Sequence, residues 1–295
     1  MRYLTKDWYE ICQKTGLHYG MRVHRGAGVF SEMLYQRLYR RKEKEYIQSE
    51  REVYNFDPRY FLRQDGSAFV PADKLMRGEE IEEEDIVIYQ MPEEEKERTQ
   101  KMIEAYDQRP PFDEEKCKQA FRVMQETSRM EEAEERIPVE ILRQVADMRV
   151  FCLGYCSKEI KVQLERVSRA NYKIVKLASE ANAKAQKAED ISESIRKIHN
   201  FHDSIILEIS GSNGFENRWD QFVIRMDPRG SFTECNKVTF QNADIIKQES
   251  NITGSCWLYC ELYRIEKGYE VHILFWGEGM PELILTCSDI LMEIQ

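Results

Sequence analysis

Three side chains that could do chemistry come from the last third of the sequence. His202 stands beside Asp203, and Glu261 and His272 follow within the same stretch of short apolar runs. Two histidines and a carboxylate are a possible zinc-binding set, and the same groups could transfer protons during hydrolysis. A metal-dependent hydrolase that uses His202, Glu261 and His272 is therefore one hypothesis for this sequence.

The stretch that carries these residues alternates apolar and polar side chains with a period of two, which predicts β-strands. The candidate strands cover residues 204–209, 221–226, 237–241, 255–265, 269–276 and 282–294. Only short turns separate them, so we expect an antiparallel sheet rather than parallel strands joined by helices.

Strand parity places the polar candidates among large aromatic side chains. A flat exposed face lacks the concave pocket that catalysis usually needs, but it suits protein binding because Tyr and Trp combine a large area with a polar group. The alternative is that helices of the N-terminal region cover this face. We predict a partner-binding face made of Trp257, Tyr259, Glu261, Tyr263, His272 and Trp276.

Helix signals dominate the first two thirds of the chain, so the predicted fold class is α+β. We expect a mainly helical domain over 1–155, a long helical arm over 156–198 and an antiparallel β-domain over 199–295. The arm carries a heptad-like apolar seam that includes Ile160, Leu164 and Ile174. Such a seam predicts either a contact between helices or chains, or packing of the arm along its own N-terminal domain.

Motifs for catalysis and cofactor binding are absent from the sequence. It has no glycine-rich phosphate-binding loop, no G-x-S-x-G motif and no H-E-x-x-H motif. The pairs Cys152/Cys156 and Cys256/Cys260 have a spacing that zinc permits, but alternation in the second pair favours buried apolar cysteines. We therefore predict a non-enzymatic protein with no metal and no cofactor.

The acidic charge is concentrated in the middle of the chain. The net charge is -10, and residues 61–149 carry 24 acidic and 14 basic side chains. An acidic protein binds DNA poorly but is attracted to a basic protein surface. We predict that the dense run Glu82, Glu83 and Glu84, ahead of a possible strand at 85–91, contacts such a partner.

Two further readings concern nucleic acid and membranes. Residues 34–46 interleave basic side chains with tyrosines, a pattern that binds single strands, although ion pairs along a solvated helix explain it equally well. No apolar run approaches the ~20 residues that span a bilayer, and the N-terminus has no apolar signal core. We expect a cytoplasmic protein that contacts neither nucleic acid nor membrane directly.

Three segments resemble an uncharacterised protein family of Bacillus and its phages: MRYLTKDWYEI at the start, FHD at 201–203, and WLYCELYRIEKGYEVHILF from residue 257. The last third is also similar to sheets of small immunity proteins that neutralise toxins. In those sheets H-D, W-L-Y-x-E and H-x-L elements recur, here at 202–203, 257–261 and 272–274. This second resemblance implies direct binding to a toxin.

In size, acidity, helical arm and lack of a catalytic motif the sequence resembles the Gabija anti-defence inhibitors of Bacillus phages. That resemblance implies an oligomeric inhibitor that surrounds a nuclease–helicase complex and prevents DNA binding. The leading hypothesis is thus a homo-oligomeric inhibitor whose partner is a host defence complex with a basic DNA-binding surface. A toxin complex is the alternative partner.

Overall fold

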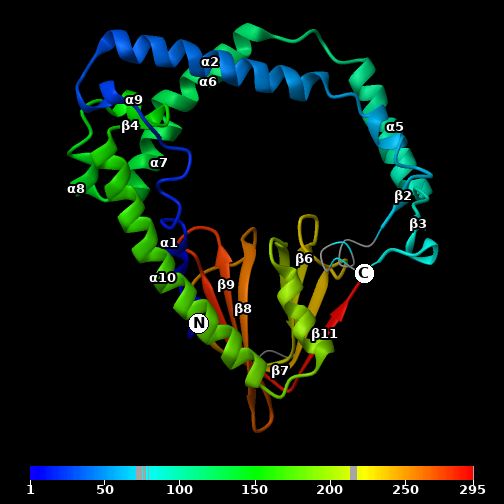
Figure 1. Cartoon of the computed structure of the whole chain (residues 1–295). Coiled ribbons are helices and arrows are strands. Elements are labelled where there is room, and N and C mark those ends of the chain that lie inside the picture. Colours follow the sequence, from blue (N-terminus) through cyan, green and yellow to red (C-terminus); the bar gives the residue numbers. More distant parts are fainter. Residues whose placement is uncertain (71–74, 76–77, 79, 213–217, 295) are drawn as a thin grey trace. The chain divides into compact units, whose positions relative to one another are not determined.

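The computed structural model of this chain describes every residue except 71–74, 76–77, 79, 213–217 and 295. The chain forms two compact units (Figure 1). The first contains residues 1–21, 136–141 and 158–295, and the second contains residues 22–135 and 142–157. The predicted α+β class is confirmed, because helices precede an antiparallel sheet. The expected divisions after 155 and 198 differ from the observed units, because residues 1–21 and the long helix pack with the sheet.

An antiparallel seven-stranded sheet forms the body of the first unit. Along the sheet the order is β10-β9-β8-β5-β6-β7-β11, and β10 also pairs with β7, so the sheet closes on itself. The strands are β5 (Ile205–Ser212), β6 (Arg218–Asp227), β7 (Lys237–Gln248), β8 (Cys256–Ile265), β9 (Gly268–Trp276), β10 (Glu282–Cys287) and β11 (Asp289–Glu293).

Alternation in these strands fills the interior of the closed sheet with apolar side chains. Phe222, Phe240, Leu262 and Phe275 are almost completely buried in one hydrophobic cluster. The short helices α11 (Glu193–Arg196) and η3 (Lys197–Phe201) add isoleucines and Phe201 to the same cluster. The sheet and the segment leading into it therefore share one core.

A β-bulge in β8 interrupts the alternation. Trp257 pairs with Phe275 and Tyr259 pairs with Leu274, which leaves Leu258 as the extra residue. A bulge reverses the face of the residues on one side of it. Trp257 consequently points into the core, whereas Tyr259 and Glu261 remain on the outer face.

Helices α1 (Lys6–Cys12) and α10 (Lys158–Ala188) pack together in the first unit. The indole Nε1 of Trp8 donates to the carbonyl of Val175 at 3.3 Å, and the Asn171 amide donates to the carbonyl of Lys14 at 2.9 Å. Ile160 and Leu164 of the predicted seam are buried, but Ile174 is exposed. Only part of the seam is therefore buried by contacts within the chain.

The long helix is shorter than the 156–198 arm predicted from sequence, because it ends at Ala188. The guanidinium of Arg196 donates to the carbonyls of Gln186, Glu189 and Ile191. These bonds satisfy carbonyls that have no partner within a helix end, so the chain can turn back after α10.

The end of α10 also protects one edge of β8. The side chain of Gln186 accepts from the backbone N–H of Leu262 at 3.0 Å, and Glu189 accepts from the N–H of Arg264 at 2.7 Å. β8 pairs with β5 only at Ile205 and Cys256, so these amides lie beyond that pairing. One side chain from the last turn of α10 and one just beyond its end thus occupy positions where a neighbouring strand would form hydrogen bonds.

The second unit is built on α2 (Glu32–Asn55), which packs against α6 (Glu114–Glu126) and α9 (Met148–Cys152). Leu34, Leu38 and Phe121 form its core. Tyr39 and Tyr46 pack on Phe121, so these rings face the core rather than an open basic surface. The unit also contains η1 (Arg25–Gly28), α7 (Ser128–Arg136) up to Glu135, and a parallel pair of short strands, β1 (Arg22–Val23) and β4 (Tyr155–Cys156). The short helix α8 (Val139–Leu142) lies mostly in the first unit.

The described residues within 56–107 of the second unit form a small, mostly exposed substructure. It contains the helices α3 (Arg59–Leu62), η2 (Glu83–Asp85) and α5 (Glu93–Asp107) and the two-stranded pair β2 (Ala68–Phe69) and β3 (Val87–Ile88). In the described ranges of the chain, no helix is both long and apolar enough to cross a membrane.

Candidate functional site

The outer face of β8 and β9 carries the polar residues singled out from the sequence. The strand register places Glu261 opposite His272 and Tyr263 opposite Glu270. This face is covered rather than open: Glu261 is 0% exposed and His272 is 6% exposed. The covering element is the chain's own N-terminal segment, residues 1–5, followed by α1.

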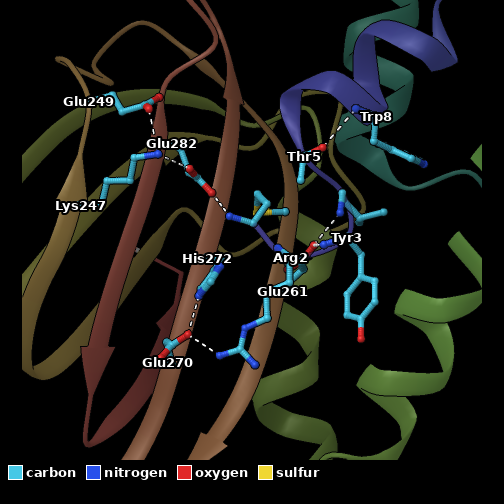
Figure 2. A network of polar contacts seen from close by, with 12 residues as sticks. Arg2, Tyr3, Thr5, Trp8, Lys247, Glu249, Glu261, Glu270, His272 and Glu282 are labelled. Atoms are coloured by element: carbon cyan, nitrogen blue, oxygen red, sulfur yellow. Dashed lines mark hydrogen bonds and ion pairs between the residues drawn. The ribbon is translucent and has the colours of Figure 1, made fainter. Parts of the chain in front are cut away.

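Glu261 binds the main chain of this N-terminal segment (Figure 2). One carboxylate oxygen accepts from the backbone N–H groups of Tyr3 and Leu4, at 2.9 and 2.7 Å. The other accepts from the N–H of Arg2 and from the hydroxyl of Tyr263, both at 2.7 Å. Four donors thus occupy both oxygens, which leaves this buried carboxylate fully hydrogen-bonded.

The side chain of Arg2 adds a second attachment. Its guanidinium lies 3.7 Å from the centre of the Tyr263 ring and donates to Glu270 at 2.7 Å. Nε2 of His272 lies 2.6 Å from the same oxygen of Glu270. A carboxylate accepts hydrogen bonds, so we assign the proton of neutral His272 to Nε2.

The contacts continue across β10 to β7 (Figure 2). The amino group of Met1 pairs with Glu282, and Glu282 also pairs with Lys247 at 2.7 Å. Lys247 lies 2.8 Å from Glu249. One chain of charges of alternating sign therefore links the N-terminal segment to two further strands.

Burial and hydrogen bonding act in opposite directions on the pKa values of this network. Burial alone would raise the pKa of Glu261, but the N–H donors and Tyr263 outweigh it and hold that pKa below its ordinary value. Burial and the bond to Glu261 raise the pKa of Tyr263. Burial lowers the pKa of His272, although Glu270 opposes the shift. Glu261 is accordingly anionic and His272 neutral near pH 7.

A family comparison covers most of the sheet that carries this network. Residues 137–285, about half of the chain, match the family model described as "Protein of unknown function (DUF4085)". The chain belongs to the DUF4085 family. No curated protein and no solved structure matches it. The part that matches DUF4085 includes Glu261, His272 and Glu282, whereas residues 1–5 that occupy the site lie outside it.

The sequence predicted an exposed aromatic face on this DUF4085 protein. That prediction is wrong for most of the residues assigned to the face. Trp257 is 1% exposed because the bulge turns it inward, and Tyr263, Glu261 and His272 lie beneath residues 1–5. Tyr259 is half-buried against Trp8, with ring centroids 5.2 Å apart. The alternative prediction, that helices of the N-terminal region cover the face, holds only in part: α1 packs on Tyr259, but the non-helical residues 1–5 cover Glu261 and Tyr263.

Two parts of the predicted partner surface remain accessible. Trp276 is 59% exposed at the end of β9, opposite Cys256. Glu82, Glu83 and Glu84 are exposed at the start of η2 in the second unit. Their role as partner contacts stays a prediction.

The residues of the metal hypothesis are not brought together as ligands. His202 lies 3.0 Å from Asp203 and packs edge-on against Tyr259, whereas Glu261 is saturated by its four donors. Within the ranges that the structure describes, no group of three His, Cys, Asp or Glu side chains is arranged to hold a metal ion. Cys256 and Cys260 fall on opposite sides of the bulge, so they point to different faces.

The pair His202-Asp203 instead shapes the start of β5. Asp203 has a positive φ of 72°, a conformation that Asp tolerates better than most residues. Its backbone N–H donates to the carbonyl of Trp257 at 2.8 Å.

The residues that sequence reasoning missed are Arg2 and Glu270. Arg2 stands among ordinary N-terminal residues, and nothing local indicates that it binds a strand 268 residues away. The available signal was a carboxylate at a position of β8 flanked by buried residues on both sides. A buried carboxylate needs donors, and the backbone N–H groups of a distant segment can supply several.

Proposed function

We propose that this protein is a non-enzymatic inhibitor that binds a bacterial anti-phage nuclease complex of the Gabija type. It acts in the host cytoplasm and blocks both DNA binding and DNA cleavage. The observation that carries this proposal is the occupation of Glu261 by four donors of its own chain. The groups best suited to catalysis serve to attach residues 1–5, which favours a binding function.

Charge supports the choice of partner. A nuclease binds DNA through a basic surface, because neutralising the DNA phosphates supplies much of its affinity for DNA. A protein of net charge -10 is attracted to that surface and competes with DNA for it. Occlusion requires no chemistry, only a stable complex that covers the basic surface.

The helix α10 supports self-association as part of this function. Ile174 and Leu177 are exposed on it, at 51% and 68%, with Tyr172 also exposed nearby. Large apolar side chains on a charged helix are typical of interfaces. An oligomer would present several acidic surfaces to one nuclease assembly, and linked contacts raise the overall affinity well above that of one contact.

The test is reconstitution with a purified Gabija-type nuclease–helicase complex. We expect a stable complex by mass photometry, loss of DNA binding in a gel-shift assay, and inhibition of cleavage that saturates at a fixed ratio of inhibitor to nuclease. Preincubation with excess DNA should slow inhibition. Absence of a complex would contradict the proposal.

A matched variant distinguishes inhibition by binding from inhibition by an enzymatic activity. His272→Gln keeps an amide nitrogen near the position of Nε2 but cannot act as a general base or take the place of an imidazole ligand. We expect it to inhibit as well as the unchanged protein. Inhibition at far less than stoichiometric amounts, abolished in His272→Gln, would instead indicate an enzyme.

A further inference from the structure

The small strand pair β2–β3 exposes apolar side chains on both of its faces. The register pairs Phe69 with Val87 on one face and Ala68 with Ile88 on the other. Phe69 is 49% exposed, Val87 59% and Ile88 55%. A two-stranded pair is marginal in water, and antiparallel sheets normally pack at least one face on a core. Both faces of this pair are therefore left open by the part of the chain that the structure describes.

The described residues of the surrounding segment do not supply a covering layer. Neither hydrophobic core cluster includes a described residue from 56–107. Phe56, Tyr60 and Leu62 of this segment are exposed as well, and Met91 and Ile103 are its main buried apolar side chains. Several exposed large apolar side chains in one short segment are typical of a protein–protein contact region.

The apolar pair lies within the most acidic part of the chain. Residues 80–107 contain eleven Asp or Glu and three Lys or Arg. Glu82 and Asp85 form a reciprocal capping box that fixes the short helix η2 just before β3. Glu83 and Glu84 on that helix are exposed and bear no hydrogen bond to a basic side chain in the described contacts. The surface thus combines apolar area with unneutralised negative charge.

We infer that this surface is the docking site for the basic, DNA-binding face of the partner protein. We call it the hairpin surface and define it by Phe69, Ile86, Val87, Ile88, Glu82, Glu83 and Glu84. The inference rests on the proposed function and names the part of the chain that carries it out. Charge selects a basic partner, and the uncovered strands supply the apolar area that a stable interface buries.

The charge also argues against two copies joined through this surface. A symmetric contact would bring each acidic run against its own copy, and like charges across an interface are unfavourable. A copy could instead offer the basic, partly apolar side of α10. The mass of the free protein therefore has to be compared between variants before any partner is added.

Two variants test the surface, with circular dichroism to confirm folding. Val87→Asp with Ile88→Asp removes apolar area but adds negative charge, so it would strengthen a contact made by charge alone. Glu83→Lys with Glu84→Lys reverses the charge and leaves the Glu82–Asp85 capping box intact. We expect both to weaken binding to the purified nuclease–helicase complex by ~10-fold or more.

Two matched controls carry the same chemical changes elsewhere. Glu134→Lys with Glu135→Lys alters an exposed consecutive pair on α7, and Ile174→Asp with Leu177→Asp alters exposed side chains on α10. We expect binding within ~2-fold of the unchanged protein for the α7 control, and smaller losses for the α10 control than for either hairpin variant.

The outcomes separate this inference from the proposed function. If the unchanged protein binds and both hairpin variants bind equally well, the docking site is wrong while the inhibitor proposal stands. If the unchanged protein does not bind the nuclease–helicase complex, both the docking site and the inhibitor proposal are wrong. If a hairpin variant changes the mass of the free protein, the surface joins copies of this chain and the inference is overturned.

Discussion

The backbone N–H of Leu4 donates a hydrogen bond to the buried carboxylate of Glu261 at 2.7 Å, although 257 residues separate the two. Tyr3 and Arg2 donate to the same carboxylate. Three consecutive main-chain donors converge on one side chain, as they would on an anion at the start of a helix. Here the segment bends at Tyr3 and Leu4 just before α1, and a strand residue takes the place of the anion.

Replacing Glu261 by Gln should release residues 1–5 and lower the free energy of unfolding by about 2–4 kcal/mol, because a buried donor left unsatisfied costs about 1–3 kcal/mol. The amide has one acceptor oxygen, and its NH₂ group would face a backbone N–H. Urea unfolding and proteolysis within residues 1–21 would measure the effect. Glu278→Gln, an exposed carboxylate after β9, is the control and should change little. Equal stability of the two variants would contradict this account of Glu261.

The network should make stability depend on pH through His272. Burial lowers its pKa in the folded protein, so the unfolded chain takes up a proton near pH 6.5 more readily than the folded chain does. The contribution of neutral His272 to the free energy of unfolding is therefore complete above about pH 6.5, and it is lost as the pH falls below that value. Glu261 and Glu270, whose pKa values are lowered, act in the same direction at lower pH.

Urea unfolding between pH 7.5 and 5.5 would measure this dependence. We expect the free energy of unfolding to decline across this range in the unchanged protein, with contributions also from His199 and the Met1 amino group, whose pKa values burial lowers too. The decline should become less steep in His272→Gln and stay as steep in the control His202→Gln. A decline that is unchanged in His272→Gln would assign the effect to another group.

Gly268, at the turn between β8 and β9, should tolerate no side chain. Its φ is +128°, and an added Cβ would lie 2.0 Å from the carbonyl oxygen of Cys287. Because backbone is the obstacle, we expect Gly268→Ala to cost about 3 kcal/mol or more, or to prevent folding. Gly279→Ala is the control: its φ is +74°, but no atom lies within 4 Å, so only about 1 kcal/mol is expected. Thermal unfolding of both variants would decide.

The side chains that protect β8 should be visible by hydrogen exchange. Gln186→Ala removes the acceptor of the Leu262 amide, and Glu189→Ala removes that of the Arg264 amide. We expect faster exchange at the affected amide in each variant and a loss of about 1–3 kcal/mol for the more buried Gln186. Lys187→Ala, an exposed neighbour on α10, should leave both amides protected. Unaltered exchange at Leu262 in Gln186→Ala would rule out this protective role.

The sequence was sufficient to predict the sheet, because strand alternation is a local signal. Each predicted strand from 204 to 294 corresponds to an observed one, although the last is divided into β10 and β11 at Ser288. The face of Trp257 could not be predicted, since a bulge inserts one residue without a distinctive composition. Counting alternate residues back from Glu261 therefore placed Trp257 on the outer face, whereas it points into the core.

The candidate site was harder to predict than the fold. Glu261 and His272 were correctly placed on one face, because both follow the strand period. Their burial depends on Arg2, Tyr3 and Leu4, which contact them only after the whole chain has folded. The end of α10 at Ala188 likewise depends on the Arg196 guanidinium, a contact between side chain and backbone that helical periodicity does not contain.

The position of Glu261 late in the chain also has a consequence during protein synthesis. Residues 2–4 leave the ribosome well before Glu261, and at ~5–20 residues per second this acceptor follows roughly 10–50 s later. The second unit, whose residues all lie between 22 and 157, is complete long before then. Residues 2–4 must therefore wait, unattached, while a separate unit folds, and they bind the sheet unit only after Glu261 has been translated.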